Sequence, residues 1–120
     1  MSFRAPPREF FYAFPRQIEF VASVGNQLLR EFPGSVPTSW YRDQTNNARV
    51  GGAPESQHLL GFAFDLTTGD LTESRQIAAR LREAGLVAVI ESDHVHAQLF
   101  PAGFLRSLGF FWSPAGTAGP

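Results

Sequence analysis

The chain has 120 residues, 43% of them hydrophobic, and contains no cysteine. This length suits one domain with its own core, and the lack of cysteine excludes disulfides and thiolate metal ligands. The formal net charge is −1 and all ten basic residues are Arg, with no basic block to bind nucleic acid. No segment matches a signal peptide or the roughly 20 apolar residues of a membrane span. We therefore expect a protein that is made soluble in the cytoplasm.

The first half of the chain predicts an arm, a helix and a strand. Residues 1–15 are rich in proline and carry an aromatic cluster at 10–14, which predicts an extended arm packed on the domain. Pro15 suits the first turn of a helix, and apolar residues recur at helical spacing as far as Phe32, before the breakers Pro33 and Gly34. Residues 36–41 read as a strand, and 43–57, rich in Asn, Gly, Asp and Pro, as a loop.

The second half predicts a strand, a helix and a hairpin. Residues 58–66 alternate imperfectly as a strand, with Phe62 and Phe64 on the core face. A turn at 67–70 leads to a helix capped by Thr72 and closed by Gly85. Residues 86–90 and 94–100 form two strands joined by the turn 91–93, and an aromatic tail covers 101–120. This order predicts one α+β domain over 1–120, a small, mostly antiparallel sheet with helices packed on one face.

The three histidines of the chain and one aspartate suggest a metal site. His94 and His96 lie two apart on a predicted strand and so share a face, while His58 and Asp65 are seven apart. Two imidazoles and one carboxylate are a normal catalytic zinc set, which leaves the fourth position for water. Spacing alone leaves open whether one or both of His94 and His96 bind. Each histidine taken singly is more often an ordinary surface or core residue.

Hydrolysis also needs a proton acceptor and a cation. Asp93 and Glu91 lie just before the histidine pair, and either carboxylate could take a proton from water and pass it to a leaving amine. Arg42, which ends the strand before the loop, could hold a substrate carboxylate or a developing oxyanion.

Several short motifs of the chain, taken together, resemble those of a known family. The resemblance runs over residues 17–100 and rests on Ser39-Trp40-Tyr41-Arg42, Asn47, Val50-Gly51-Gly52-Ala53, Ser56-Gln57-His58, Gly61, Ala63, Asp65 and Asp93-His94-Val95-His96. These elements are similar to the signature of the M15 zinc peptidases, subfamily A, and of their relatives, which include D-alanyl-D-alanine carboxypeptidases and phage L-alanyl-D-glutamate endopeptidases. The resemblance implies the fold of the Hedgehog and D-Ala-D-Ala peptidases, and Zn²⁺ as cofactor.

The resemblance also implies roles for single residues. His58, Asp65 and His96 match the zinc ligands, and Asp93 matches the general base. His94 is similar to a histidine that binds substrate or polarises the carbonyl, and Arg42 to the arginine that steadies the carbonyl or oxyanion. The role of Ser56 is less defined, and Glu91 remains the alternative base.

Two departures from the family pattern bear on the backbone and the core. Trp40 stands where glycine is usual, so we expect no positive φ beside Arg42. Phe62 and Phe64 are bulkier than usual and should face the core, away from the metal.

The expected function is hydrolysis of a peptide bond in peptidoglycan stem peptides, by a phage enzyme of lysis or infection that reaches the cell wall after release or within a virion. The sequence leaves open the bond that is cut and whether the enzyme is an endo- or a carboxypeptidase. The alternative is a virion-associated structural or binding module that keeps the fold and metal site and docks through the aromatic arm and tail. Membrane contact by the tail is a weaker idea, because Gly109 and a single arginine make a poor interfacial helix.

Overall fold

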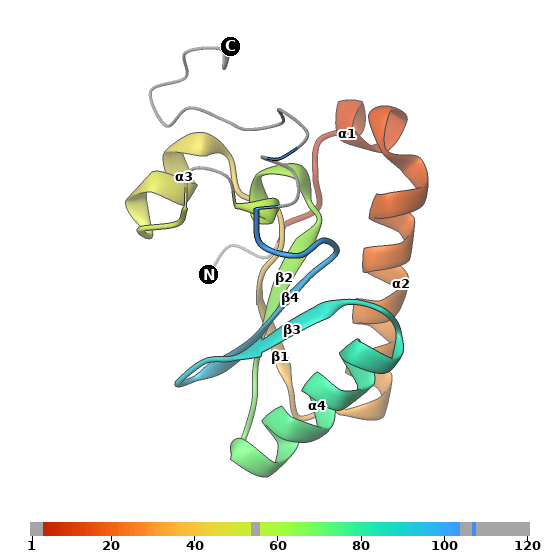
Figure 1. Ribbon diagram of the computed structural model, residues 1–120, viewed down its shortest axis with the longest axis vertical. Helices are drawn as coiled ribbons and strands as arrows, with labels where there is room; N and C mark the ends of the chain where they lie inside the picture. Colours follow the sequence, from red (N-terminus) through yellow and green to blue (C-terminus); the bar gives the residue numbers. More distant parts are fainter. Residues whose placement is uncertain (1–3, 54–55, 104–106, 108–120) are drawn as a thin grey trace.

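The computed structural model describes residues 4–53, 56–103 and 107 (Figure 1). Four strands, β1 (Val36–Ser39), β2 (Ala63–Thr67), β3 (Val87–Ile90) and β4 (His94–Gln98), form an antiparallel sheet in the order β1-β2-β4-β3. Helices α2 (Pro15–Glu31) and α4 (Leu71–Glu83) lie on the same side of the sheet in Figure 1. The predicted α+β architecture is therefore confirmed.

The core lies between the sheet and these two helices. Helix α2 turns Val21 and Leu28 inward, and α4 turns Ile77 and Leu81 inward, each at helical spacing. The sheet contributes alternate residues of its two central strands, paired in register as Phe64 with Ala97 and Leu66 with Val95. Because strand side chains alternate between faces, the residues between these, Asp65 and His96, are directed to the opposite face.

The ends of α2 and α4 follow ordinary helix chemistry. Pro15 is at the first position of α2, as predicted. At α4 the predicted cap Thr72 is wrong, because the Asp70 carboxylate accepts the Glu73 N–H at 2.8 Å and the helix begins at Leu71. Gly85 closes α4 with φ of 96°, a left-handed conformation that glycine adopts at little cost.

Two further predictions fail at short helices. Residues 8–13 form α1 (Arg8–Ala13) rather than an extended arm. They do pack on the domain, since the Phe10 ring meets the Tyr41 ring edge-on at 5.4 Å. The predicted loop contains α3 (Gln44–Arg49), whose first turn is capped by the Asp43 carboxylate, an acceptor for the Asn46 N–H at 2.7 Å.

The predicted strand over 58–66 begins later than expected. Residues Gln57–Leu60 form the 3₁₀ helix η1, and only Ala63–Thr67 are β2. Both Phe62 and Phe64 are buried, as expected, Phe62 in a small cluster with Ile18 and Leu60. No described residue other than glycine has a positive φ, which agrees with the expectation for Trp40.

The aromatic tail falls almost entirely on residues that lie outside the described part of the chain, so its docking role stays a prediction. Within the described residues, no helix combines the length and the apolar character needed to cross a membrane.

Candidate metal and active site

A capped turn and a glycine shape the segment that carries His58 and leads to Asp65. The Ser56 hydroxyl accepts the His58 N–H at 3.2 Å and so caps η1. Gly61 ends η1 with φ of 77°, and a Cβ there would lie 2.3 Å from Cγ of Pro6. Glycine is therefore required at position 61 for both its backbone conformation and its close approach to the N-terminal segment.

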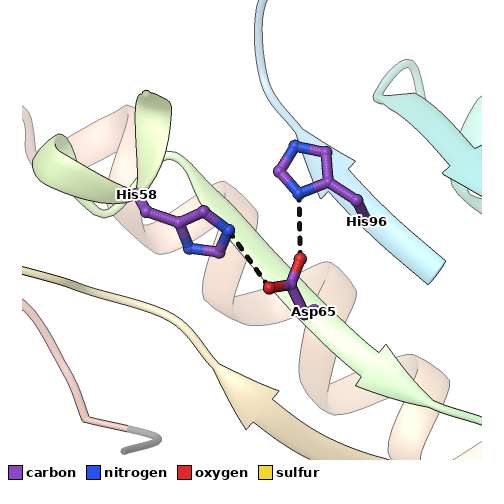
Figure 2. Close-up of side chains that lie close together, drawn as sticks. All are labelled: His58, Asp65 and His96. Carbon is purple, nitrogen blue, oxygen red and sulfur yellow. Dashed lines mark hydrogen bonds and ion pairs between the residues drawn. The ribbon is translucent and has the colours of Figure 1, made fainter. Parts of the chain in front are cut away.

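His58, Asp65 and His96 come together on the sheet face opposite α2 and α4 (Figure 2). Nε2 of His58 is 3.3 Å from one Asp65 oxygen, and Nδ1 of His96 is 2.9 Å from the other. One ligand atom from each of the three residues lies within 4.8 Å of the others. The structure thus groups the three residues that the sequence predicted as metal ligands.

The buried ring of His58 presents a bare nitrogen to this group. Its Nδ1 lies 2.6 Å from the Trp40 carbonyl oxygen, which can only accept, so Nδ1 carries the proton and Nε2 offers a lone pair. The side chain is 2% exposed, and Nε2 makes no hydrogen bond of acceptable geometry among the described residues. An unpaired buried polar atom is costly. A divalent cation held by this nitrogen and its neighbours removes that cost, so the donor set fits zinc.

The charges around Asp65 favour its ionised form. Burial raises the pKa of this carboxyl, but its interactions with His58 and His96 outweigh burial and hold the pKa well below the usual range. For His96, burial lowers the pKa, and the hydrogen bonds to Asp65 and Gln98 reverse that effect and raise it. The carboxylate of Asp65 therefore favours a positive charge at this position.

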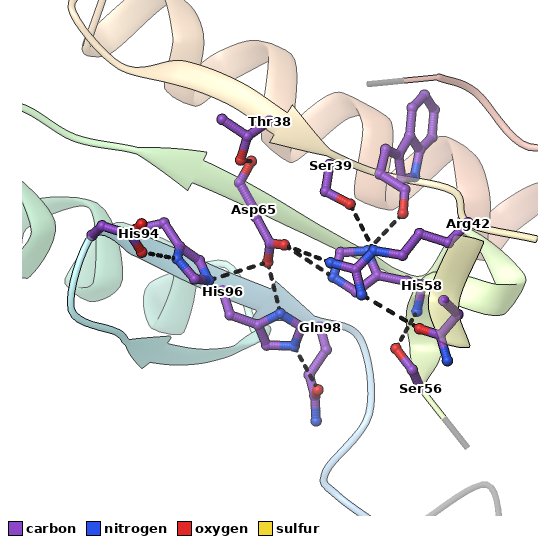
Figure 3. Close-up of polar contacts among 12 residues, drawn as sticks. Thr38, Ser39, Arg42, Ser56, His58, Asp65, His94, His96 and Gln98 are labelled. Carbon is purple, nitrogen blue, oxygen red and sulfur yellow. Dashed lines mark hydrogen bonds and ion pairs between the residues drawn. The ribbon is translucent and has the colours of Figure 1, made fainter. Parts of the chain in front are cut away.

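Arg42 lies beside the cluster and is fixed by three polar partners (Figure 3). Its guanidinium donates to Ser39 Oγ at 3.0 Å, to Asn47 Oδ1 at 3.4 Å and to Asp65 Oδ2 at 3.1 Å. Asn47 is buried and also donates to the Ala53 carbonyl at 2.9 Å. The asparagine of the sequence motif thus fastens both Arg42 and the loop that leads to η1.

Of the two candidate proton acceptors, Glu91 lines the cavity directly and Asp93 does not. The Asp93 side chain is 82% exposed and contacts Nδ1 of His94 at 2.6 Å. The other ring nitrogen of His94, Nε2, lies 4.0 Å from Asp65 Oδ1. His94 and Glu91 line the cavity, whereas Asp93 is not among its lining residues. Asp93 therefore reaches the site through the ring of His94.

The cluster forms part of the wall of a cavity of about 400 Å³. It is lined by Arg42, Ser56, Glu91, His94, Gln98 and the backbone of the segments around Gly52 and Gly103, among others. Among the polar lining residues, Gln57 lies in a quoted motif but was given no role, and Gln98 was not singled out at all. For Gln98 a signal exists, because it follows His96 by two residues on the same strand and so shares its face.

The site combines two imidazoles, one carboxylate and an adjacent arginine beside an open cavity, a set of side chains that could hold a metal ion. The family model for Peptidase M15 matches residues 19–98, and the chain belongs to this family. The chain is accordingly a peptidase, a hydrolase of peptide bonds. No curated protein and no solved structure matches it significantly.

Proposed function

We propose that the protein is a zinc-dependent peptidase that cleaves a peptide bond in the stem peptides of peptidoglycan. The proposal of a metal site depends on the buried Nε2 of His58, which makes no hydrogen bond of acceptable geometry among the described residues and faces Asp65 and His96 beside an open cavity. Membership of the peptidase family supplies the reaction.

His58, Asp65 and His96 would hold the zinc ion. When bound, the ion supplies a Lewis acid that polarises a carbonyl and lowers the pKa of water from 15.7 to about 7. The protein prepares this site before loading. The Trp40 carbonyl fixes the proton of His58 on Nδ1, and Asp65 is held ionised.

Arg42 is placed to act on the substrate. Its side chain is 17% exposed, and its contacts with Ser39 and Asn47 fix the guanidinium on the cavity wall without help from the substrate. A fixed cation of this kind stabilises negative charge that develops on the scissile carbonyl oxygen, or binds a substrate carboxylate. A lysine could not replace it, because the three contacts use three different nitrogens of the guanidinium.

Asp93 is the proposed proton acceptor, working with His94. Its carboxylate contacts Nδ1 of His94, and Nε2 of that ring faces the metal cluster. The pair could pass a proton from water to the leaving amine, or His94 could polarise the carbonyl. Glu91 remains the alternative because it lines the cavity directly.

The peptidoglycan substrate and a phage role in lysis or infection rest on the sequence resemblance to D-alanyl-D-alanine carboxypeptidases and phage endopeptidases. A cavity of about 400 Å³ has room for a few residues of a peptide. The scissile bond would be one next to D-Ala or the bond between L-Ala and D-Glu.

Digestion of purified peptidoglycan by the zinc-loaded chain, followed by mass spectrometry of the fragments, tests this proposal. We expect fragments cut at one of these bonds, and none after Asp93→Asn although zinc is still bound. Full activity of Asp93→Asn together with an inactive Glu91→Gln would move the base to Glu91. A loaded wild-type chain that cuts unrelated peptides but never stem peptides would contradict the proposed substrate.

A further inference from the structure

We infer that Gln98 and Gln57 are positioning residues that hold His96 with Nδ1 directed at the metal. This inference rests on the proposed zinc site and extends it beyond the three ligands. Gln98 accepts from the His96 ring, and Gln57 fixes the chain segment on which Gln98 depends.

The two imidazoles of the site present different nitrogens. His58 is protonated on Nδ1 and offers Nε2. His96 has the reverse arrangement, because its Nδ1 faces Asp65 at 2.9 Å and its Nε2 faces Gln98 Oε1 at 2.8 Å. A histidine can bind a metal through Nδ1 only if Nε2 carries the proton, and the acceptor on Nε2 decides this. Gln98 Oε1 is that acceptor.

The orientation of the Gln98 amide follows from its other contact. Its Nε2 donates to the Phe100 carbonyl oxygen at 2.8 Å. If the amide were turned over, its oxygen would face that carbonyl and its NH₂ would face the ring, so two acceptors would oppose each other. The Phe100 carbonyl therefore directs the oxygen of Gln98 at His96.

Gln57 holds Phe100 in place by a double hydrogen bond. Its Nε2 donates to the Phe100 carbonyl at 2.6 Å, and its Oε1 accepts the Phe100 N–H at 2.9 Å. Gln57 is 6% exposed and directly precedes His58 in η1. The Phe100 ring packs on Phe62 with a centroid distance of 5.9 Å. One backbone unit thus links the segment that carries His58 to the end of the strand that carries His96.

The test uses the full chain with zinc, and compares Gln98→Met with Gln98→Glu. Methionine keeps the unbranched shape but has no comparable acceptor, whereas glutamate keeps an oxygen for the Nε2–H of His96. We expect Gln98→Met to bind zinc roughly 10- to 100-fold more weakly in competition with a chromophoric chelator. Gln98→Glu should bind zinc more tightly than Gln98→Met, because it keeps the acceptor for His96, but less tightly than the wild type, because it loses the donor to the Phe100 carbonyl.

Nitrogen-15 NMR of the imidazoles adds a readout that loss of stability alone does not move. The chain has only three histidines, so their ring signals can be assigned. In the zinc-loaded wild type we expect His58 to bind through Nε2 and His96 through Nδ1, with the His96 proton on Nε2. In Gln98→Met the His96 Nε2–H should lose its protection from exchange or move to Nδ1.

The outcomes separate this inference from the proposed function. A wild-type chain that binds zinc with His96 ligated through Nε2 overturns the inference without any variant, and so does a Gln98→Met chain with wild-type affinity and ring signals. If Gln98→Met does not fold, Gln98→Val, which suits a strand, replaces it under the same criteria. A wild-type chain that binds no zinc overturns both the zinc site and the inference.

Discussion

Substitution of Gly61 tests how the N-terminal segment and η1 fix His58, the first of the proposed metal ligands. Gly61 has φ of 77°, and a Cβ there would lie 2.3 Å from Pro6 Cγ and 3.2 Å from Pro6 Cβ. A left-handed backbone costs a residue with a Cβ about 1–2 kcal/mol. Overpacking against the buried Pro6 ring adds about 1–3 kcal/mol. Gly61→Ala should therefore lower the free energy of unfolding by about 2–5 kcal/mol.

Gly51→Ala is the matched control, because Gly51 has φ of 74° but nothing within 4 Å of an added Cβ. It should cost only the backbone term of about 1–2 kcal/mol. The assay is urea unfolding of the metal-free chains, with equal m-values required for the comparison. Pro6→Gly should recover most of the excess loss in Gly61→Ala. Equal losses in the two alanine variants would refute the contact between Pro6 and Gly61.

Two further predictions concern the support of Arg42 and the effect of pH. Asn47→Ala leaves the Ala53 carbonyl without its side-chain donor and Arg42 without one acceptor. It should cost about 1–3 kcal/mol in urea unfolding and reduce kcat/KM, and an unchanged kcat/KM would contradict the role given to Asn47. Burial lowers the pKa of His96, but its hydrogen bonds to Asp65 and Gln98 outweigh burial and raise that pKa above 6.5. The resulting stabilisation of the folded state is fully present below pH 6.5 and is lost as the pH rises through the raised pKa. The free energy of unfolding of the metal-free chain should thus fall as the pH rises above 6.5, whereas a profile without that fall would contradict the Asp65–His96 hydrogen bond.

Strong periodic patterns in the sequence predicted the long elements correctly. The helix that begins at Pro15, the hairpin with its turn at 91–93 and the closing glycine at position 85 all occur in the structure. In each case local chemistry and burial agree. The prolyl ring suits the first turn of a helix, and alternating burial suits a strand.

The errors fall where tertiary contacts or a single cap decide a short element. Helix α1 is only six residues long and has no periodic apolar pattern that would predict it. It is packed on the domain by aromatic contacts such as that of Phe10 with Tyr41. Helix α3 has weak helix formers, and its one local signal is the capping residue Asp43. The 3₁₀ helix that carries His58 depends on Ser56 and Gly61, whose local roles the motif alone does not reveal.

The candidate site was predictable as a set of residue types, but not as a network. Spacing left open whether His94 or His96 binds, and the family resemblance selected His58, Asp65 and His96, which the structure places together. Spacing could not show that Asp93 reaches the site through His94, because this depends on how the turn before β4 directs the two side chains. Nor could it show the amide contacts of Gln57 with Phe100, which join segments 43 residues apart.

Metal analysis of the purified chain tests the central claim most directly. After loading with zinc and removal of free metal, we predict one zinc ion per wild-type chain, and a large loss of zinc in both His58→Ala and Asp65→Ala. Glu91→Gln, which removes a charge from the cavity wall but no ligand, should keep the full content. A folded wild-type chain without zinc, or an Asp65→Ala chain with as much zinc as the wild type, would contradict the account.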